Sequence, residues 1–115
     1  FALTAKTRTT LSSAAIDALT VIAFDLAAMF WSASGRGHHP RFLLHDSPRV
    51  ADMSPVPYAA IFEAVKAAEQ LGQDPPNFQY IITTTEAPPD ELKKDHLILE
   101  LDASTPAGRL FKRDL

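Results

Sequence analysis

The sequence predicts an α/β fold with a mostly parallel sheet and flanking helices. Two short apolar runs, residues 42–45 and 78–83, have the length of buried strands and are bounded by turn-forming residues. Two longer segments with helical character, residues 14–31 and 54–72, alternate with these runs. Strands that alternate with helices usually form parallel sheets, because a parallel connection needs a crossover segment. A third β-rich run, residues 97–101, completes the order helix, strand, helix, strand, strand.

Length and composition are those of one small domain. The chain has 115 residues, and 46% of them are apolar, which is enough to build a core. Its 11 basic and 14 acidic residues give no broad cationic field, so non-specific nucleic-acid binding by this chain alone is disfavoured. The absence of cysteine excludes disulfides, thiolate catalysis and cysteine-based zinc sites. We expect a cytoplasmic protein, because this composition is compatible with a reducing compartment and no signal segment opens the sequence.

The first helix is preceded by two candidate N-cap residues, Ser12 and Ser13. The threonine-rich residues 1–10 before them predict a strand or a loop. Residues 14–31 are almost all apolar, and we expect a helix that is buried on most of its circumference. Its length approaches that of a membrane span, but two aspartates inside it would each cost roughly 2.5–3.5 kcal/mol near the bilayer centre. We therefore expect a core helix and no membrane partner.

Turn-forming residues separate the elements in the middle of the chain. Residues 32–40 predict a surface loop. The apolar run after this loop leads to Asp46, and Pro48 marks a turn. Ser54 and the prolines after it predict a helix start, and Gly72 predicts its end.

The last third of the chain predicts one more buried strand and an edge strand. Residues 78–83 form the buried strand, and residues 84–90 form a loop at its end. Residues 91–95 predict a short helical turn. The run at 97–101 alternates enough to lie near the edge of the sheet, and residues 109–115 form a mixed basic tail.

Asp46 is the residue that points most directly to a function. It follows a buried strand, and open α/β sheets bind their ligands beyond the carboxyl ends of the strands. An apolar strand that ends in aspartate has the form of a Walker B element, whose aspartate helps to hold the magnesium of a bound nucleotide. The structural alternative is an aspartate that caps the turn before Pro48.

Three segments resemble, in the same order, the C-terminal half of the head domain of SMC and RecN-like ABC-type ATPases. Residues 11–15 (LSSAA) resemble the signature motif, residues 42–46 (FLLHD) resemble Walker B, and residues 79–85 (QYIITTT) resemble the strand into the switch loop. Residues 49–53 lie where this family has its D-loop. More narrowly, the stretches FDLA, LLHDSP and QYIITT are similar to an uncharacterised bacterial family of SMC-like ATPase C-terminal regions. The resemblance covers about residues 10–101.

This resemblance implies a Mg-ATP site that is completed by a separate N-terminal lobe carrying Walker A. Asp46 would hold Mg²⁺ through a water molecule, Ser47 stands where the family has its catalytic glutamate, and Thr84 stands near the switch histidine. The resemblance also assigns cofactor-binding roles to Ser12, Ser13, Asp52 and Thr85. It implies a homo-oligomer in which ATP joins two heads, a coiled coil in the full protein, and DNA as a partner of the whole assembly in DNA maintenance.

The sequence departs from the family pattern in ways that limit its activity. It contains no G-x-x-x-x-G-K-[ST], so the backbone cradle for phosphates is missing. A serine at position 47 is a poor general base near neutral pH, and Thr84 or Thr85 replaces the switch histidine. Because the chain also begins at Phe1, we expect a fragment of a larger head. By itself, this single domain of residues 1–115 is expected neither to bind nor to hydrolyse ATP.

Two other functions remain open alternatives. The first is a non-catalytic protein-interaction module that retains half of the fold and an eroded nucleotide site. The second is an unrelated small α/β enzyme that uses Asp46, His45 or Glu86. A hydrolase triad of His45, Asp46 and Ser47 is disfavoured, because successive strand residues point to opposite faces.

The remaining polar candidates have structural interpretations that we prefer. His38 and His39 lie in a glycine-containing loop with no fixed spacing to His45, so a solvated loop is favoured over a metal site. Asp25 lies inside the first helix and needs a partner, for which a structural hydrogen bond is the default.

The family resemblance makes one geometric prediction that a structure can test. Residues 42–45 and 78–83 should be neighbouring parallel strands, with Asp46 and Thr84 at the same edge of the sheet. An antiparallel pairing would contradict the resemblance. We also expect apolar surface along the first helix and the sheet edge, and hence self-association.

Overall fold

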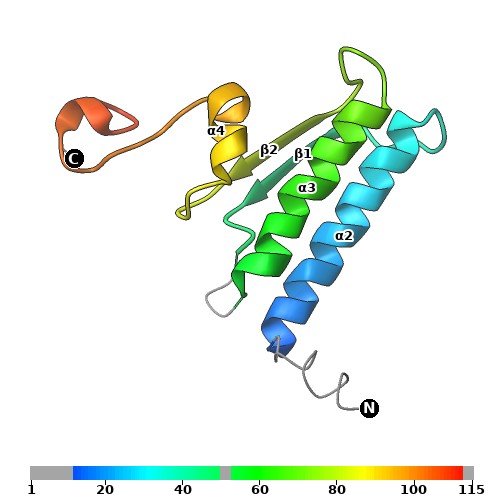
Figure 1. Cartoon of the computed structure of the whole chain (residues 1–115), viewed down its shortest axis with the longest axis horizontal. Helices are drawn as coiled ribbons and strands as arrows, with labels where there is room; N and C mark the ends of the chain where they lie inside the picture. The colour runs from blue at the N-terminus through cyan, green and yellow to red at the C-terminus, as the bar shows by residue number, and fades with distance from the viewer. Residues whose placement is uncertain (1–11, 50–52, 113–115) are drawn as a thin grey trace.

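The structure is a computed structural model in which residues 12–49 and 53–112 are described. Two strands, β1 (Phe42–Asp46) and β2 (Gln79–Thr83), form a small sheet. Two long helices, α2 (Ser13–Ala33) and α3 (Pro55–Leu71), run along it (Figure 1). The shorter helix α4 (Asp90–His96) and a 3₁₀ turn, η1 (Pro106–Gly108), follow. The fold class is therefore α/β, as predicted.

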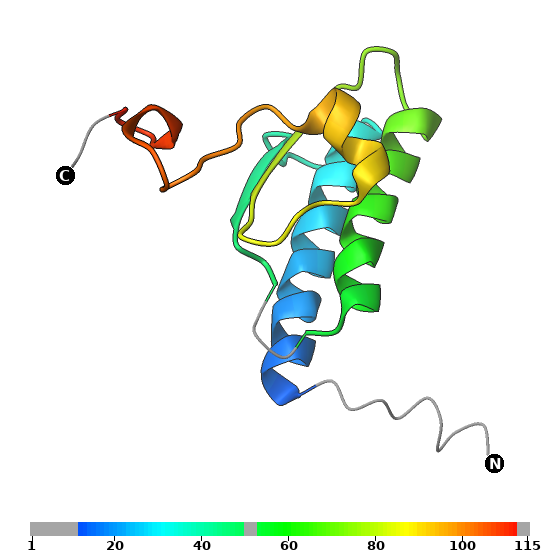
Figure 2. The same cartoon turned by 60° about the vertical axis from the view of Figure 1, so that its left-hand side comes forward.

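The two strands are parallel, which confirms the geometric prediction made from the sequence. The pairing runs from Phe42 opposite Gln79 to Asp46 opposite Thr83. Helix α3 provides the connection between them, because a parallel pair cannot be joined by a tight hairpin. The strands therefore place their carboxyl ends at one edge, on the same end of the molecule as the N-termini of α2 and α3 (Figures 1 and 2).

Both long helices pack on the same face of the sheet. Side chains that alternate along the strands explain this arrangement, since Leu43 and Tyr80 point toward the helices. They pack against a buried cluster made by α2 and α3: Ile22, Leu26, Met29 and Ile61. A second buried cluster draws α4 onto the helices: Ala15, Met53, Tyr58, Phe62 and Leu92. The core is thus one layer thick and lies between the helix pair and the sheet.

Helix α2 buries only one side, and the expectation of burial around most of its circumference was wrong. Its buried residues recur on one face. The opposite face carries exposed apolar side chains, namely Ile16, Val21, Phe24 and Trp31. The sheet and α3 cover one face, and none of the described residues covers the other. By length and composition α2 could also cross a membrane, a property that core helices of soluble proteins share.

The predicted third strand is absent from the described residues. Residues 97–101 run away from the body of the molecule as an irregular segment (Figure 2). Their side chains are exposed, with 91% of Ile98 and 63% of Leu99 open to solvent. The residue pattern suits a strand, but a strand also needs a neighbour for its backbone hydrogen bonds. No described segment of the chain lies beside this one to supply them.

The other predicted boundaries hold to within a few residues. Helix α3 begins at Pro55, directly after Ser54, and the N–H of Gly72 donates to the carbonyl of Ala68 at its end (3.1 Å). Helix α4 spans the predicted short turn at 91–95 and extends slightly beyond it. The expectation for residues 1–10 falls outside the described residues.

Candidate functional site at the carboxyl edge of the sheet

Asp46 and Thr83 are in direct contact at the carboxyl ends of the two strands, which we call the carboxyl edge of the sheet. The Thr83 Oγ1 hydroxyl donates to Asp46 Oδ1 at 2.5 Å. The parallel register explains the contact, because partners opposite each other in the sheet point to the same face. Both side chains are exposed, on the face away from the helices. The other carboxylate oxygen, Oδ2, makes no hydrogen bond with the described residues, so it is open to a ligand.

Ser47 continues this group of polar atoms. Its backbone N–H donates to the Thr83 carbonyl at 2.9 Å, and its hydroxyl donates to Asp46 Oδ1 at 3.4 Å. Its φ of +48° lies in the left-handed region, which non-glycine residues seldom adopt. Such conformations cluster at functional sites, where the surrounding structure holds them in place. The backbone turn at Ser47 thus fixes its hydroxyl beside the Asp46 carboxylate.

Thr84 lies at the same edge but faces the helices. Its hydroxyl shares a hydrogen bond of 2.7 Å with the Tyr58 hydroxyl of α3. The same oxygen accepts from the Glu86 backbone N–H at 3.0 Å and closes the turn after β2. The expected meeting of Asp46 and Thr84 at one edge is therefore found for the backbone, but Thr83 supplies the side chain that contacts Asp46.

The other predicted cofactor-binding residues are not part of this group. Ser12 is the N-cap of α2, and its hydroxyl accepts from the Ala15 backbone N–H at 3.1 Å. Ser13 is the first residue of α2 and is exposed. Thr85 is exposed and makes no side-chain hydrogen bond with the described residues. Asp52 lies outside the described residues.

An arginine and a glutamate flank the edge. The Arg49 Nη1 atom lies 3.2 Å from Glu86 Oε2 in an ion pair. The Arg49 Nε–H donates to the Met53 carbonyl at 3.2 Å. The guanidinium also lies 5.4 Å from the centre of the Tyr58 ring, within the range of a cation–π contact. These contacts tie the segment after β1 to the loop after β2. They also occupy Glu86 in an ion pair, away from Asp46.

His45 belongs to a separate polar group on the helix side of the sheet. Its Nε2 lies 3.0 Å from Asp25 Oδ2 of α2, and its Nδ1 lies 2.9 Å from the Tyr80 hydroxyl of β2. Burial is the main cause that raises the pKa of Tyr80 to about 12, so this hydroxyl stays protonated at neutral pH. In the neutral His45 tautomer that carries its hydrogen on Nε2, the Nε2–H donates to the Asp25 carboxylate and Nδ1 accepts from the Tyr80 hydroxyl.

The His45 group decides two questions that the sequence left open. Asp25 has a structural hydrogen bond, which confirms its default interpretation. His45 and Asp46 point to opposite faces of the sheet, so they cannot act with Ser47 as a triad. Among the described residues, no three histidine or acidic side chains are grouped closely enough to hold a metal ion by themselves.

Residues 1–114 match the profile of a family described as "Uncharacterised protein conserved in bacteria (DUF2326)". The chain belongs to this bacterial family. No curated protein and no solved structure matches it. The match to DUF2326 confirms that the chain is part of an uncharacterised bacterial family, and it carries no link to ATPase heads.

Sequence reasoning missed two residues of this DUF2326 chain that shape the edge, Thr83 and Tyr58. Thr83 could have been found from the strand pairing, because a parallel register that ends both strands together puts it opposite Asp46. In the sequence, the spacing of Tyr58 predicts only a side chain on the apolar face of α3. Only its three-dimensional position shows that its hydroxyl reaches the loop after β2.

Proposed function

We propose that this chain is the C-terminal lobe of an SMC-like ATPase head. In this proposal it supplies signature, Walker B and switch elements to a Mg-ATP site that a Walker A lobe of the same protein completes. The observation that carries the proposal is the parallel pair β1 and β2, with Asp46 beside Thr83 at the carboxyl edge. The edge beyond parallel strands is where α/β proteins bind nucleotides.

The residues present fit a magnesium contact made through water. Asp46 is exposed, its Oδ1 is held by Thr83 and Ser47, and its Oδ2 is open. A carboxylate with one fixed and one open oxygen suits Mg²⁺, which keeps several waters and binds through one or two carboxylates together with phosphates. When bound, Mg²⁺ would neutralise charge on the phosphates. Asp46 is the residue of this chain that would orient its water shell.

The other residues would have positioning roles in this lobe. Thr83 and Ser47 hold the Asp46 carboxylate, and Thr84 fixes the turn that follows β2. Ser12 and Ser13 lie at the N-terminus of α2, a place that favours negative charge. There they would approach the nucleotide of an opposing head, which makes ATP the link between two copies.

The decisive experiment measures Mg-ATP binding by calorimetry in two proteins. The first is the 115-residue chain, and the second is the same chain joined to a Walker A lobe from its full-length protein. We expect binding only in the joined protein. Asp46→Ala should weaken it at least tenfold, which corresponds to about 1.4 kcal/mol. The matched control is Asp95→Ala, which removes an exposed acid from α4 and should leave the affinity unchanged.

A non-catalytic docking module is the second candidate, and one observation favours it. Hydroxyls that the proposal would bring to a nucleotide are already engaged inside the chain, Thr84 with Tyr58 and Ser12 with the start of α2. A site kept for hydrolysis would be expected to leave such groups open to the nucleotide. Binding of Mg-ATP by the joined protein that ignores Asp46→Ala would favour this alternative.

A further inference from the structure

The segment after α4 forms an arm, residues 97–112, that leaves the body of the molecule (Figures 1 and 2). Its first five residues have a strand-like sequence. Their large apolar side chains are open to solvent, from 40% of Leu97 to 91% of Ile98. Two more apolar residues near its end, Leu110 and Phe111, are 62% and 64% exposed. Apolar segments with strand-forming residues rarely stay bare in soluble proteins, because their edges recruit a partner strand.

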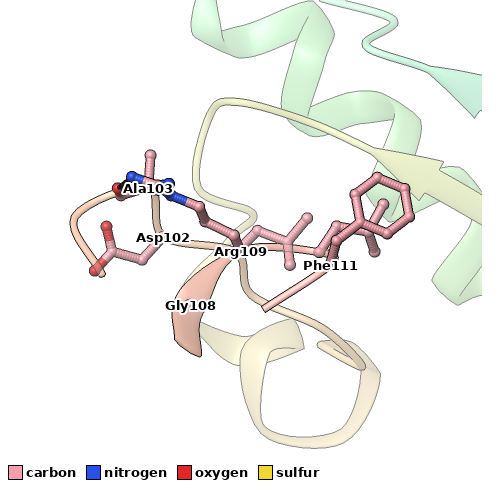
Figure 3. A pocket seen from close by; sticks show the side chains of 7 residues that line it. Asp102, Ala103, Gly108, Arg109 and Phe111 are labelled. Carbon is pink, nitrogen blue, oxygen red and sulfur yellow. Dashed lines mark hydrogen bonds between the residues drawn. The ribbon is translucent and has the colours of Figure 1, made fainter. Parts of the chain in front are cut away.

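The turn within the arm is closed by its own hydrogen bonds, although it lies away from the core. The Asp102 N–H donates to the Gly108 carbonyl at 2.8 Å, and the Arg109 Nη2–H donates to the Ala103 carbonyl at 3.1 Å. A side chain at position 108 would approach the Asp102 carbonyl oxygen to 2.5 Å, so the closure requires glycine. Figure 3 shows side chains that line a pocket in this turn, with Arg109 reaching back toward Ala103 and Phe111 lying on the side away from Ala103.

The sheet carries an apolar surface that matches the arm. On the face away from the helices, 48% of Phe42 and 51% of Leu44 are open to solvent. Both belong to β1, whose only partner among the described strands is β2. Among the described residues, the other edge of β1 therefore has no strand beside it, and we call it the free edge of β1. The arm's segment at 97–101 has the same length.

We propose that two copies of this chain exchange arms, with residues 97–101 of each copy adding to the free edge of β1 in the other. Aligning the two five-residue segments places Leu99 opposite Leu44 at their centres, in either strand direction. One face of the added strand then carries Leu97, Leu99 and Leu101. These side chains lie beside the exposed Phe42 and Leu44 of β1.

A second copy is the occupant because the chain carries both halves of the contact. A two-fold dimer uses the same surface twice, so each copy donates one arm and accepts another. Reciprocal exchange covers exposed apolar surface of the arm and of β1 in both copies at once. The exchange uses neither Asp46 nor a nucleotide, so it is independent of the proposed ATPase function.

Light scattering of the 115-residue chain without nucleotide gives the first test. We expect a dimer, and Leu99→Asp should convert it to a monomer by placing a charge in the new sheet. The matched control is Leu71→Asp at the end of α3, where 89% of the side chain is exposed and no contact is proposed. It should remain dimeric. A monomeric parent chain, or a dimer that persists with Leu99→Asp, overturns the proposal.

Disulfide cross-linking gives the second test, and the absence of native cysteine makes it unambiguous. Leu44→Cys and Leu99→Cys are made in separate chains, mixed and oxidised. We expect a disulfide between the two different chains, while Leu71→Cys mixed with Leu99→Cys should give only background. A third sample carries Leu44→Cys and Leu99→Cys in the same chain. If the disulfide forms only within this double variant, the arm folds onto its own sheet and the proposed exchange is wrong.

Discussion

At the scale of single residues, the structure separates two polar groups that the sequence places side by side. His45 and Asp46 are neighbours in β1, yet His45 joins Asp25 and Tyr80 under the helices, and Asp46 joins Thr83 and Ser47 on the open face. The twofold alternation of a strand is the cause. One group is therefore structural, and the other is accessible to a ligand.

The buried hydroxyl of Tyr80 gives a prediction about alkaline pH. Its pKa is raised from 10.0 to about 12, so between these values the unfolded chain releases a proton that the folded chain keeps. Stability from this group is complete below pH 10 and is lost as the pH rises to about 12. Absorbance titration should show one of the two tyrosines ionising late. Tyr80→Phe should remove this late component, whereas Tyr58→Phe should leave it; the opposite result would contradict the burial of Tyr80.

At the scale of elements, α4 is held to the rest of the domain by one buried side chain. Leu92 is 8% exposed and packs in the cluster with Met53, Tyr58 and Phe62. An ion pair between Lys66 and Glu91 and a hydrogen bond between His96 and Glu69 also join α4 to α3. Both lie near the surface, where such contacts contribute little. Burial of Leu92 therefore decides where α4 lies.

Leu92→Ala should lower the free energy of unfolding by about 2–3 kcal/mol, because it leaves a cavity between α4 and the helix pair. The matched control is Leu71→Ala, where the side chain is 89% exposed and the loss should stay within about 0.5 kcal/mol. Urea unfolding of both variants measures the difference. Equal losses would show that α4 does not depend on the Leu92 contact.

At the scale of the whole molecule, the described residues leave several apolar surfaces uncovered. One face of α2, the outer face of the sheet and the arm all expose large apolar side chains. The sheet has two strands among the described residues, so it depends on its packing against α2 and α3 for stability. These features are what we expect of a lobe that packs against other protein, either a second copy or a Walker A lobe.

The proposed function makes a prediction about turnover. The chain has Asp46 for a metal but no phosphate cradle, so the 115 residues alone should release no phosphate from ATP. Joined to a Walker A lobe, the protein should hydrolyse ATP slowly, because Ser47 is a poor base. Ser47→Glu should raise this rate, and Ser47→Gln, which has a similar size but no basic group, should not. Robust turnover by the chain alone would instead indicate a self-contained enzyme.

The fold class, the two long helices and the two parallel strands could be predicted from local sequence patterns. Apolar spacing and turn residues are local properties, so residues 42–45 and 78–83 could be recognised as strands without knowing their neighbours. The same reasoning placed Asp46 at the carboxyl edge and gave Asp25 a structural partner. It could not name that partner, since His45 lies 20 residues away along the chain.

Which side chains meet, and which segments stay unpaired, depends on how the elements pack in three dimensions. The register put Thr83, rather than Thr84, against Asp46, and it turned Thr84 toward Tyr58. The segment at 97–101 has a strand's sequence but no strand's hydrogen bonds, because these depend on a neighbour that the described residues do not supply. Pairing is a property of two segments in space, and no local pattern in one of them can settle it.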